Sequence, residues 1–176
     1  VEAEELKEEL IERARVTSVT AGGRQLRFRA SIVIGDGKGR VGLGIGKSGE
    51  VQWAIEKAIR DAKKNLVSFN IVNGTIAHDV SVNFKASSLF LHPAHPGTGI
   101  IAGGAVRKIC SVSGLKDVIA KQHGGSNPIT NARVAMRAFS SLKPVSQIKS
   151  FAKVTPTEKV ESTPVAKKTP APKAAK

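Results

Sequence analysis

Hydrophobic and polar residues alternate between residues 15 and 48, and this pattern predicts β-strands joined by glycine-containing turns. The run at 26–34 has an apolar face made of Leu26, Phe28, Ala30, Ile32 and Ile34. Its other face carries Arg27, Arg29, Ser31 and Val33. We therefore expect one core face and one mostly basic face. A shorter strand around Val16 and Val19 precedes this run, and a hairpin turn at 21–24 connects the two.

Glycines recur at close spacing after this strand. Residues 35–39 make a second reversal, and alternate positions of the following run at 40–46 are glycine. A strand that lacks every second side chain lets another group approach its backbone closely. Two interpretations fit: the glycines form turns and a bulged strand with a solvated basic edge, or their peptide N–H groups bind phosphates together with Lys38, Arg40 and Lys47. The basic chain favours the second interpretation.

Two nucleotide-binding motifs are matched only in part. The spacing Gly37-x-Gly39-x-x-Gly42 is that of a dinucleotide-binding turn, but such a turn opens a helix, and the run that follows here resembles a strand. The run Gly46-Lys47-Ser48 resembles the end of a phosphate-binding loop. That loop requires a glycine five positions before Gly46, where this chain has Val41. Nucleotide binding is therefore disfavoured.

Two segments of the first half have helical spacing. Leu6, Leu10 and Ile11 among glutamates predict an acidic helical extension over residues 1–14. A second helix follows Ser48 as its N-cap, with an apolar stripe of Val51, Ile55, Ala58, Ile59, Ala62 and Leu66. Its opposite face carries Trp53, Lys57, Arg60 and Lys64. We expect Trp53 to pack on the stem of Lys57; stacking on a base or a partner is the alternative.

The second half has the pattern of an α+β domain. A turn-rich joint at 70–74 is the expected boundary, and strands at 76–84 and 89–91 are expected to pair as a hairpin. A helix is predicted over 97–109, a short strand at 118–120, a polar glycine loop at 121–127, and a final helix capped by Asn131. His92 and His95 have a metal-ligand spacing, but no carboxylate or cysteine is near them in the sequence, so a metal site is disfavoured.

Composition indicates a polyanionic partner. The chain has 176 residues, a formal net charge of +14 and a pI near 10.3. Residues 1–15 are net −3, residues 16–150 net +13 and residues 151–176 net +4, so the expected folded part carries most of the charge. The single cysteine, Cys110, excludes a disulfide framework and is typical of a buried inert thiol in a reducing cytosol. No signal peptide or membrane span is predicted, and since the chain starts at Val1, preceding residues are expected to be missing.

Several stretches resemble the family of bacterial small-subunit ribosomal protein S5. These are GGR at 22–24, GDGKGRVGLGIGK at 35–47, AIEKAIRDAKKN at 54–65, NGTI at 73–76, GTGIIAGGAVR at 97–107 and GSNPI at 125–129. They occur in the family's order and cover about residues 10–142. The GTGIIAGG run is highly specific, whereas the short glycine turns alone are not.

This resemblance implies an α+β fold in several parts. A double-stranded-RNA-binding-like domain at 15–70 would be followed by an α+β domain with a left-handed crossover at 71–149; the composition of residues 150–176 predicts a disordered basic tail. It further implies a structural, non-enzymatic rRNA-binding component of the cytoplasmic small ribosomal subunit, with roles in assembly, the mRNA entrance region and decoding accuracy. Proteins S4 and S8 would be partners and S3 a neighbour, with no cofactor, metal, membrane or small-molecule substrate.

The expected site residues follow from both arguments. The RNA-binding candidates are Thr20, Gly22, Gly23, Arg24, Arg27, Arg29, Lys38, Arg40, Lys47, Arg60 and Lys64. Gly99 and Arg107 match family positions that contact S4. Ala21 and Trp53 depart from the family's usual residues, lysine at the first position and proline or a small residue at the second. The alternatives are a phosphate-handling enzyme and a free histone-like DNA-compacting protein whose basic tail would be central.

Overall fold

The computed structural model describes residues 6–143, and the first half of this range forms a four-stranded antiparallel sheet with one helix. Its elements are β1 (Lys7–Thr20), β2 (Gly23–Gly35), β3 (Arg40–Ser48), α1 (Val51–Lys64) and β4 (Leu66–Ser68). The sheet order is β1-β2-β3-β4, so each strand pairs with its neighbour in sequence. Both predicted reversals, before and after β2, are present.

The second half forms a mixed sheet with two helices. Its elements are β5 (Val80–Phe84), β6 (Ser87–Pro93), β7 (Ile100–Ile101), α2 (Gly104–Ser113), β8 (Val118–Gly124) and α3 (Pro128–Ser141). The sheet order is β5-β6-β8-β7, and the predicted hairpin is the antiparallel β5–β6 pair. Strands β7 and β8 are parallel and are joined by α2, which makes this segment a β-α-β crossover unit. The predicted α+β class is confirmed.

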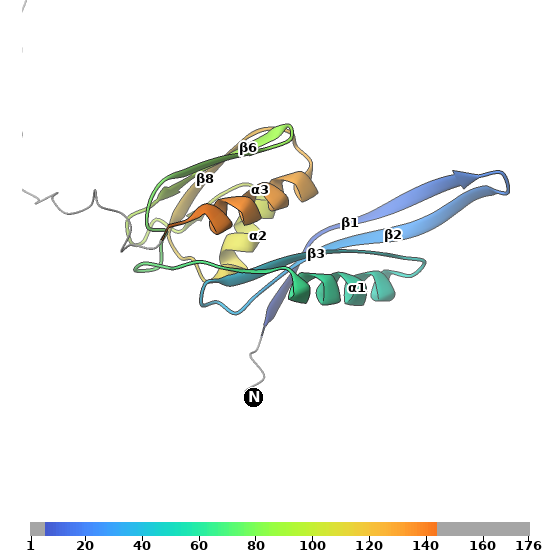
Figure 1. The fold of residues 1–176 in the computed structure, drawn as a ribbon, viewed down its shortest axis with the longest axis horizontal. Helices are drawn as coiled ribbons and strands as arrows, with labels where there is room; N and C mark the ends of the chain where they lie inside the picture. The colour runs from blue at the N-terminus through green and yellow to red at the C-terminus, as the bar shows by residue number, and fades with distance from the viewer. Residues whose placement is uncertain (1–5, 144–176) are drawn as a thin grey trace, which may run out of the picture.

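The elements lie in four layers (Figure 1). Helix α1 covers one face of the first sheet, and α2 and α3 lie between the two sheets, where they contact strands of both. The largest apolar cluster crosses the boundary between the two halves, with Val33, Val41 and Phe69 on one side and Val106 and Phe139 on the other. The rings of Phe69 and Phe139 stack with centroids 4.5 Å apart. The two halves therefore share one core.

Strand β2 is buried on both faces near its end. Ile32 and Ile34 pack against α1, as predicted. On the other face, Val33 belongs to the core shared with α2 and α3, and Ser31 is also buried. The prediction that this face is mostly basic is wrong at Ser31 and Val33, where α2 and α3 cover it.

The predicted N-terminal helix is wrong over the residues that the structure describes. Residues 7–14 are the first part of β1. This strand pairs with β2 from Lys7 to Thr20 and has a bulge between Leu10 and Glu12. Leu6 and Leu10 pack on the α1 side of the sheet, and Ile11 packs against the core on the other side. Residues that are four positions apart lie on the same face in a helix and also in a strand. The spacing of Leu6 and Leu10 therefore could not distinguish a helix from a strand. Within residues 6–143, the first sheet is therefore not preceded by a helix.

Helix starts were also predicted imprecisely. The N-cap of α1 is Glu50, which makes no side-chain cap hydrogen bond, and Ser48 lies in β3. The cap of α3 is Asn127, whose side-chain oxygen accepts a hydrogen bond from the N–H of Ile129 at 3.0 Å, while Asn131 is buried one turn later. Pro128 at the first helical position was the signal for this start. Leu66, expected in α1, begins β4.

The segments around α2 and β8 differ from the prediction as well. Helix α2 starts at Gly104 rather than at residue 97, because the N–H groups of Gly97 and Gly99 donate to Asp117 Oδ1 at 3.0 and 2.8 Å. Both glycines have positive φ, which holds the loop outside helical geometry. Strand β8 extends to Gly124, through part of the expected loop at 121–127. The predicted tail at 150–176 lies outside the described residues.

Candidate nucleic-acid interface

The most prominent surface feature is a two-stranded arm formed by the turn-proximal parts of β1 and β2 (Figure 1). Every residue from 17 to 27 is exposed, and the register runs from Ala14 opposite Arg29 to Thr20 opposite Gly23. At the turn, the hydroxyl of Thr20 donates to the carbonyl of Gly23 at 3.2 Å, and Gly23 has a φ of +116°. The arm therefore keeps its shape through its own strand pairing and offers both faces to a partner.

Within residues 17–27, each face of the arm carries one arginine. Residues opposite each other in an antiparallel pair share a face. One face therefore carries the pairs Val19–Arg24 and Thr17–Leu26, and the other carries Ser18–Gln25 and Val16–Arg27. Each arginine thus shares its face with hydroxyl and apolar side chains, of which Val19 is 75% exposed.

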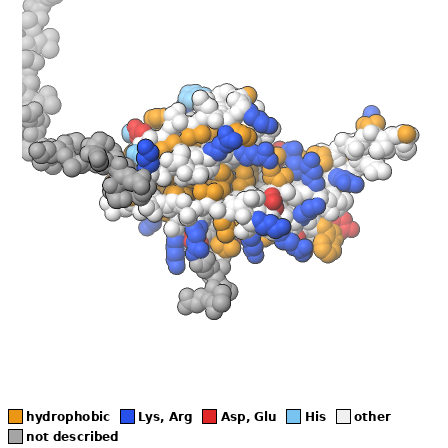
Figure 2. Space-filling model, viewed as in Figure 1, with side chains coloured by type: hydrophobic (Ala, Val, Ile, Leu, Met, Phe, Trp, Pro, Cys, Tyr) orange, Lys and Arg blue, Asp and Glu red, His pale blue; other side chains and the backbone are white. Residues whose placement is uncertain are grey.

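The base of the arm leads into a cationic groove along α1. A hollow of about 310 Å³ at the base is lined by Val16, Thr17, Ser18, Gln25, Arg27 and Lys47. Lys47 also lines a larger hollow of about 600 Å³ between α1 and β3, together with Ile45, Ser48, Trp53, Glu56, Lys57, Arg60, Asp61 and Lys64. Figure 2 shows Lys and Arg side chains gathered over α1 and near the base of the arm. Arm and groove thus form one connected basic surface.

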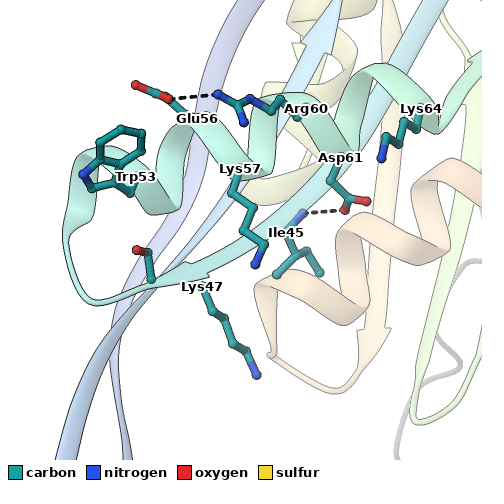
Figure 3. Close-up of a pocket in the computed structure, with 9 residues that line it drawn as sticks. Ile45, Lys47, Trp53, Glu56, Lys57, Arg60, Asp61 and Lys64 are labelled. Atoms are coloured by element: carbon teal, nitrogen blue, oxygen red, sulfur yellow. Dashed lines mark hydrogen bonds and ion pairs between the residues drawn. The ribbon is translucent and has the colours of Figure 1, made fainter.

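The two carboxylates in the α1 groove have partners within it (Figure 3). Glu56 forms an ion pair with Arg60 at 3.4 Å, and Asp61 Oδ2 accepts the N–H of Ile45 at 3.0 Å. Strand β4 pairs only with residues 40–42 of β3, so the outer edge of β3 at Ile45 has no neighbouring strand. Asp61 therefore accepts a hydrogen bond from an N–H group that would otherwise lack a protein acceptor. Lys47, Lys57 and Lys64 form no ion pair among the described residues.

A third hollow extends this surface across the boundary between the two halves. Its volume is about 360 Å³, it shares Ile45 and Asp61 with the α1 groove, and it is also lined by Arg133 and Arg137 of α3. The guanidinium of Arg137 lies over the ring of Phe84, 4.3 Å from its centroid. Arg133 and Arg137 are four residues apart and so share a face of α3, but the sequence gives no signal that this face adjoins α1.

The turn at residues 35–39 does not offer its peptide groups to a ligand. The N–H groups of Gly37 and Gly39 donate to the carbonyl oxygens of Val112 and Ser113 at the end of α2, at 3.2 and 3.1 Å. These oxygens are among the last in the helix, which have no partner within it. The expectation that this turn binds phosphates through its backbone is therefore wrong for Gly37 and Gly39, because α2 already occupies their N–H groups.

Asp36 holds the same turn together. Its carboxylate accepts the N–H groups of Lys38 and Arg40 at 2.8 and 3.0 Å and pairs with the Arg40 side chain at 2.8 Å. Burial alone would raise the pKa of Asp36, but these hydrogen bonds and the charge of Arg40 outweigh it and lower the pKa below its ordinary value of 3.8. The side chains of Lys38 and Arg40 remain exposed, roughly 40 Å along β2 from the arm tip.

The bare face of β3 is also occupied. A Cβ on Gly42, Gly44 or Gly46 would lie 2.4, 2.0 and 2.0 Å from the carbonyl oxygens of Ala62, Ala58 and Ala54. These alanines are the buried residues of α1, so a strand without side chains receives a helix face of methyl groups. The close approach that the sequence predicted is present, but its partner is α1 rather than a nucleic acid.

Arg29 is less available than the arm arginines. Its guanidinium forms an ion pair with Glu12 at 3.4 Å, and its side chain is 26% exposed. The Nε atom is buried and has no hydrogen-bond partner among the described residues. Of the predicted arginines, Arg24 and Arg27 lie on the exposed arm, and Arg29 lies at its base.

Two family models match most of the residues that form this fold. The family model described as "Ribosomal protein S5, N-terminal domain" matches residues 6–70, and "Ribosomal protein S5, C-terminal domain" matches residues 82–151. The chain belongs to the ribosomal protein S5 family. The N-terminal domain of S5, as matched here, contains the arm and the α1 groove, and the C-terminal domain contains α2 and α3.

Curated relatives carry the same family name. The chain is 46% identical to the small ribosomal subunit protein uS5 of a Polaromonas species over 143 residues, which is 81% of this chain and 83% of the relative. It is 46% identical to the uS5 proteins of Gloeobacter violaceus and Thermotoga neapolitana, over 82% and 81% of this chain. These matches cover 65% of the Gloeobacter protein and 79% of the Thermotoga protein.

The two residues predicted to contact S4 lie near a fourth hollow, which is also basic. Gly99 is held by Asp117, and Arg107 is exposed on α2. Arg107 lines a hollow of about 520 Å³ together with Glu9, Ile100, Gly104, Lys108, Ser111 and Lys116. Lys108 Nζ donates to the carbonyl oxygen of Leu10 at 2.6 Å, beside the β1 bulge. In this S5 chain, Lys108 thus joins the two domains, a role that sequence reasoning missed.

His92 has a carboxylate partner and Cys110 is buried. His92 Nδ1 lies 2.6 Å from Asp79 Oδ1, a carboxylate that is distant in sequence but close in the fold. No group of three or more His, Cys, Asp or Glu residues is close enough to hold a metal ion within residues 6–143. Burial raises the pKa of the Cys110 thiol to about 12. No helix in this range is long and apolar enough to cross a membrane.

Proposed function

We propose that this S5 chain is a non-catalytic rRNA-binding component of the small ribosomal subunit. Its relatives are named small ribosomal subunit proteins, which supports a structural place in that particle. Within it, the chain contributes to subunit assembly, to the mRNA entrance region and to decoding accuracy. It acts in the cytoplasm as part of the ribosome.

The observation that carries this proposal is the exposed arm connected to a cationic groove. Residues 17–27 make no core of their own, and an arm without a core is suited to lie against a large partner. The groove below it collects the charges of Lys47, Lys57 and Lys64. Clustered lysines and arginines bind the phosphate backbone and position a protein on it.

The proposed RNA contacts fall in three places. The arm supplies Thr20, Gly22, Gly23, Arg24 and Arg27, with Arg29 at its base; the α1 groove supplies Lys47, Arg60 and Lys64; the distant turn supplies the side chains of Lys38 and Arg40. Gly99 and Arg107 are the proposed contact with protein S4. Proteins S8 and S3 are a proposed further partner and a neighbour.

Salt dependence of RNA binding tests this function. We expect the affinity of the full chain for a small-subunit rRNA fragment to fall steeply over about a tenfold range of salt, because each neutralised phosphate releases counterions. Equilibrium filter binding at several salt concentrations measures the slope. Binding that stays flat across this range would contradict the proposal.

An enzyme that handles phosphates is the main alternative. The phosphate-loop motif is broken at Val41, and the N–H groups of Gly37 and Gly39 already bind α2. Retention of radiolabelled ATP by the chain would support the enzyme. A free DNA-compacting protein would depend on residues 151–176, so deleting them separates the two cases: the ribosomal role predicts that the shortened chain still assembles into subunits.

A further inference from the structure

We infer that Trp53 is a stacking platform for an unpaired RNA base at one end of the cationic α1 groove. This inference rests on the proposed rRNA binding and adds a specific nucleotide subsite to it. The occupant is an RNA strand with an accessible base, and its phosphates lie along the lysines and arginine of the helix.

The subsite begins with the spacing of four residues along α1. Trp53, Lys57, Arg60 and Lys64 follow one another at intervals of four, three and four residues, so they form one stripe on the helix. This stripe is about 16 Å long at the rise of an α-helix. Figure 3 shows Trp53 near the N-terminal end of α1, and Lys57 reaching towards β3, which carries Lys47.

The indole is not needed by the protein core. The adjacent Ala54 is fully buried between α1 and the sheet, whereas Trp53 is 59% exposed. Among residues 6–143, no ring stacking or cation–π contact involves Trp53. A large aromatic surface is thus left accessible beside several cations.

The combination of an exposed indole with cations favours RNA over an acidic protein segment. Both carboxylates already have partners, Glu56 with Arg60 and Asp61 with the Ile45 N–H, so neither needs a cation from a ligand. An aromatic ring followed by cations matches the sugar-phosphate chain of a single strand, in which a flat base and negative charges alternate. An acidic peptide supplies the negative charge but no base to cover the indole.

Intrinsic fluorescence gives a direct test, because Trp53 is the only tryptophan and the chain has no tyrosine. The full chain is titrated with an RNA duplex that has one unpaired adenosine, with the fully paired duplex, and with the bulged duplex whose extra nucleotide lacks its base. The phosphate charge is closely matched in the two bulged RNAs. We expect strong quenching and the tightest binding only with the unpaired adenosine.

Substitutions separate stacking from charge. Trp53→Ala should weaken binding of the bulged duplex about tenfold, within the range for one stacked base, and leave binding of the paired duplex unchanged. Trp53→Phe should retain part of the preference. Phe90→Ala is the matched control, since Phe90 is another exposed aromatic, on β6 of the C-terminal domain, and its loss should not alter the preference. Thermal unfolding of each variant checks that the fold is kept.

The possible outcomes distinguish this inference from the proposed function. Salt-sensitive binding of all three RNAs with equal affinity and equal emission would overturn the subsite and leave rRNA binding intact. Equal quenching by the paired and bulged duplexes would place RNA near the indole without stacking, which also overturns it. Failure to bind any of these RNAs at low salt would count against both proposals.

Discussion

The arm and the body of the N-terminal sheet use glycine in opposite ways. At the arm tip, a Cβ on Gly22 would meet no atom within 4 Å. In the body, a Cβ on Gly44 would lie 2.0 Å from the carbonyl oxygen of Ala58. Glycine at the tip permits a turn, while glycine in β3 makes room for a helix. The comparison shows that glycine-rich sequence near basic residues does not by itself indicate a phosphate site.

The largest expected effect contrasts these two glycines. Gly44→Ala should destabilise the fold by about 3 kcal/mol or prevent folding, because the added methyl group overlaps the backbone of α1. Gly22→Ala should change stability by less than about 0.5 kcal/mol, because its site is open. Urea unfolding followed by circular dichroism measures both. Equal stability of the two variants would show that β3 and α1 can separate without cost.

The sequence predicts local turns, such as that at the arm tip, better than the packing partners of the sheet body. The turn at 21–24 and the turn-rich segment at 70–74 were predicted, since local residues decide them. Within the second segment, Asn73 and Gly74 have positive φ, and Val72 and Thr75 exchange two backbone hydrogen bonds of 2.9 Å. The close approach to β3 was predicted, but its partner was not. Nothing local in residues 42–46 specifies whether a helix of the same chain or an RNA fills the space.

The candidate site was predictable in its charges and less so in its geometry. Helical periodicity placed Lys57, Arg60 and Lys64 with Trp53 on one face, and the structure has them lining one groove. The sequence did not reveal that Arg133 and Arg137 continue this surface, since their position depends on how α3 packs across the shared core. It also did not reveal that the C-terminal end of α2 uses the N–H groups of Gly37 and Gly39.

An intermediate effect is expected at Asp36, which organises the turn in the body. The folded state lowers the pKa of Asp36, so it favours the ionised carboxylate; this stabilisation is present above about pH 4 and is lost as the pH falls through the lowered pKa. Asp36→Asn should destabilise the fold by about 2 kcal/mol at neutral pH, since N–H donors lose a charged acceptor.

The pH dependence gives the control for Asp36. The difference in unfolding free energy between the wild type and Asp36→Asn should shrink as the pH falls below about 4, through the lowered pKa at which the wild-type carboxylate becomes protonated. Glu56→Gln is the matched variant, because Glu56 is an exposed carboxylate with an arginine partner, and it should show no such convergence. A difference for Asp36→Asn that is constant with pH would exclude its carboxylate charge as the cause.

The smallest effect on stability is expected on the arm, where the effect on RNA should be clear. Replacing both Arg24 and Arg27 with glutamine should change the unfolding free energy by less than about 0.5 kcal/mol, because both side chains are exposed and form no ion pair among the described residues. If each arginine contacts one phosphate, the slope of log affinity against log salt should become shallower by about 1.5 to 2. Filter binding over a salt series measures this slope. A matched pair of changes, Lys85→Gln with Lys121→Gln, removes the same charge from the C-terminal domain and should leave the slope closer to that of the wild type. An equal change in both double variants would mean that RNA responds to net charge alone, and the arm would then lose its proposed role as a specific contact.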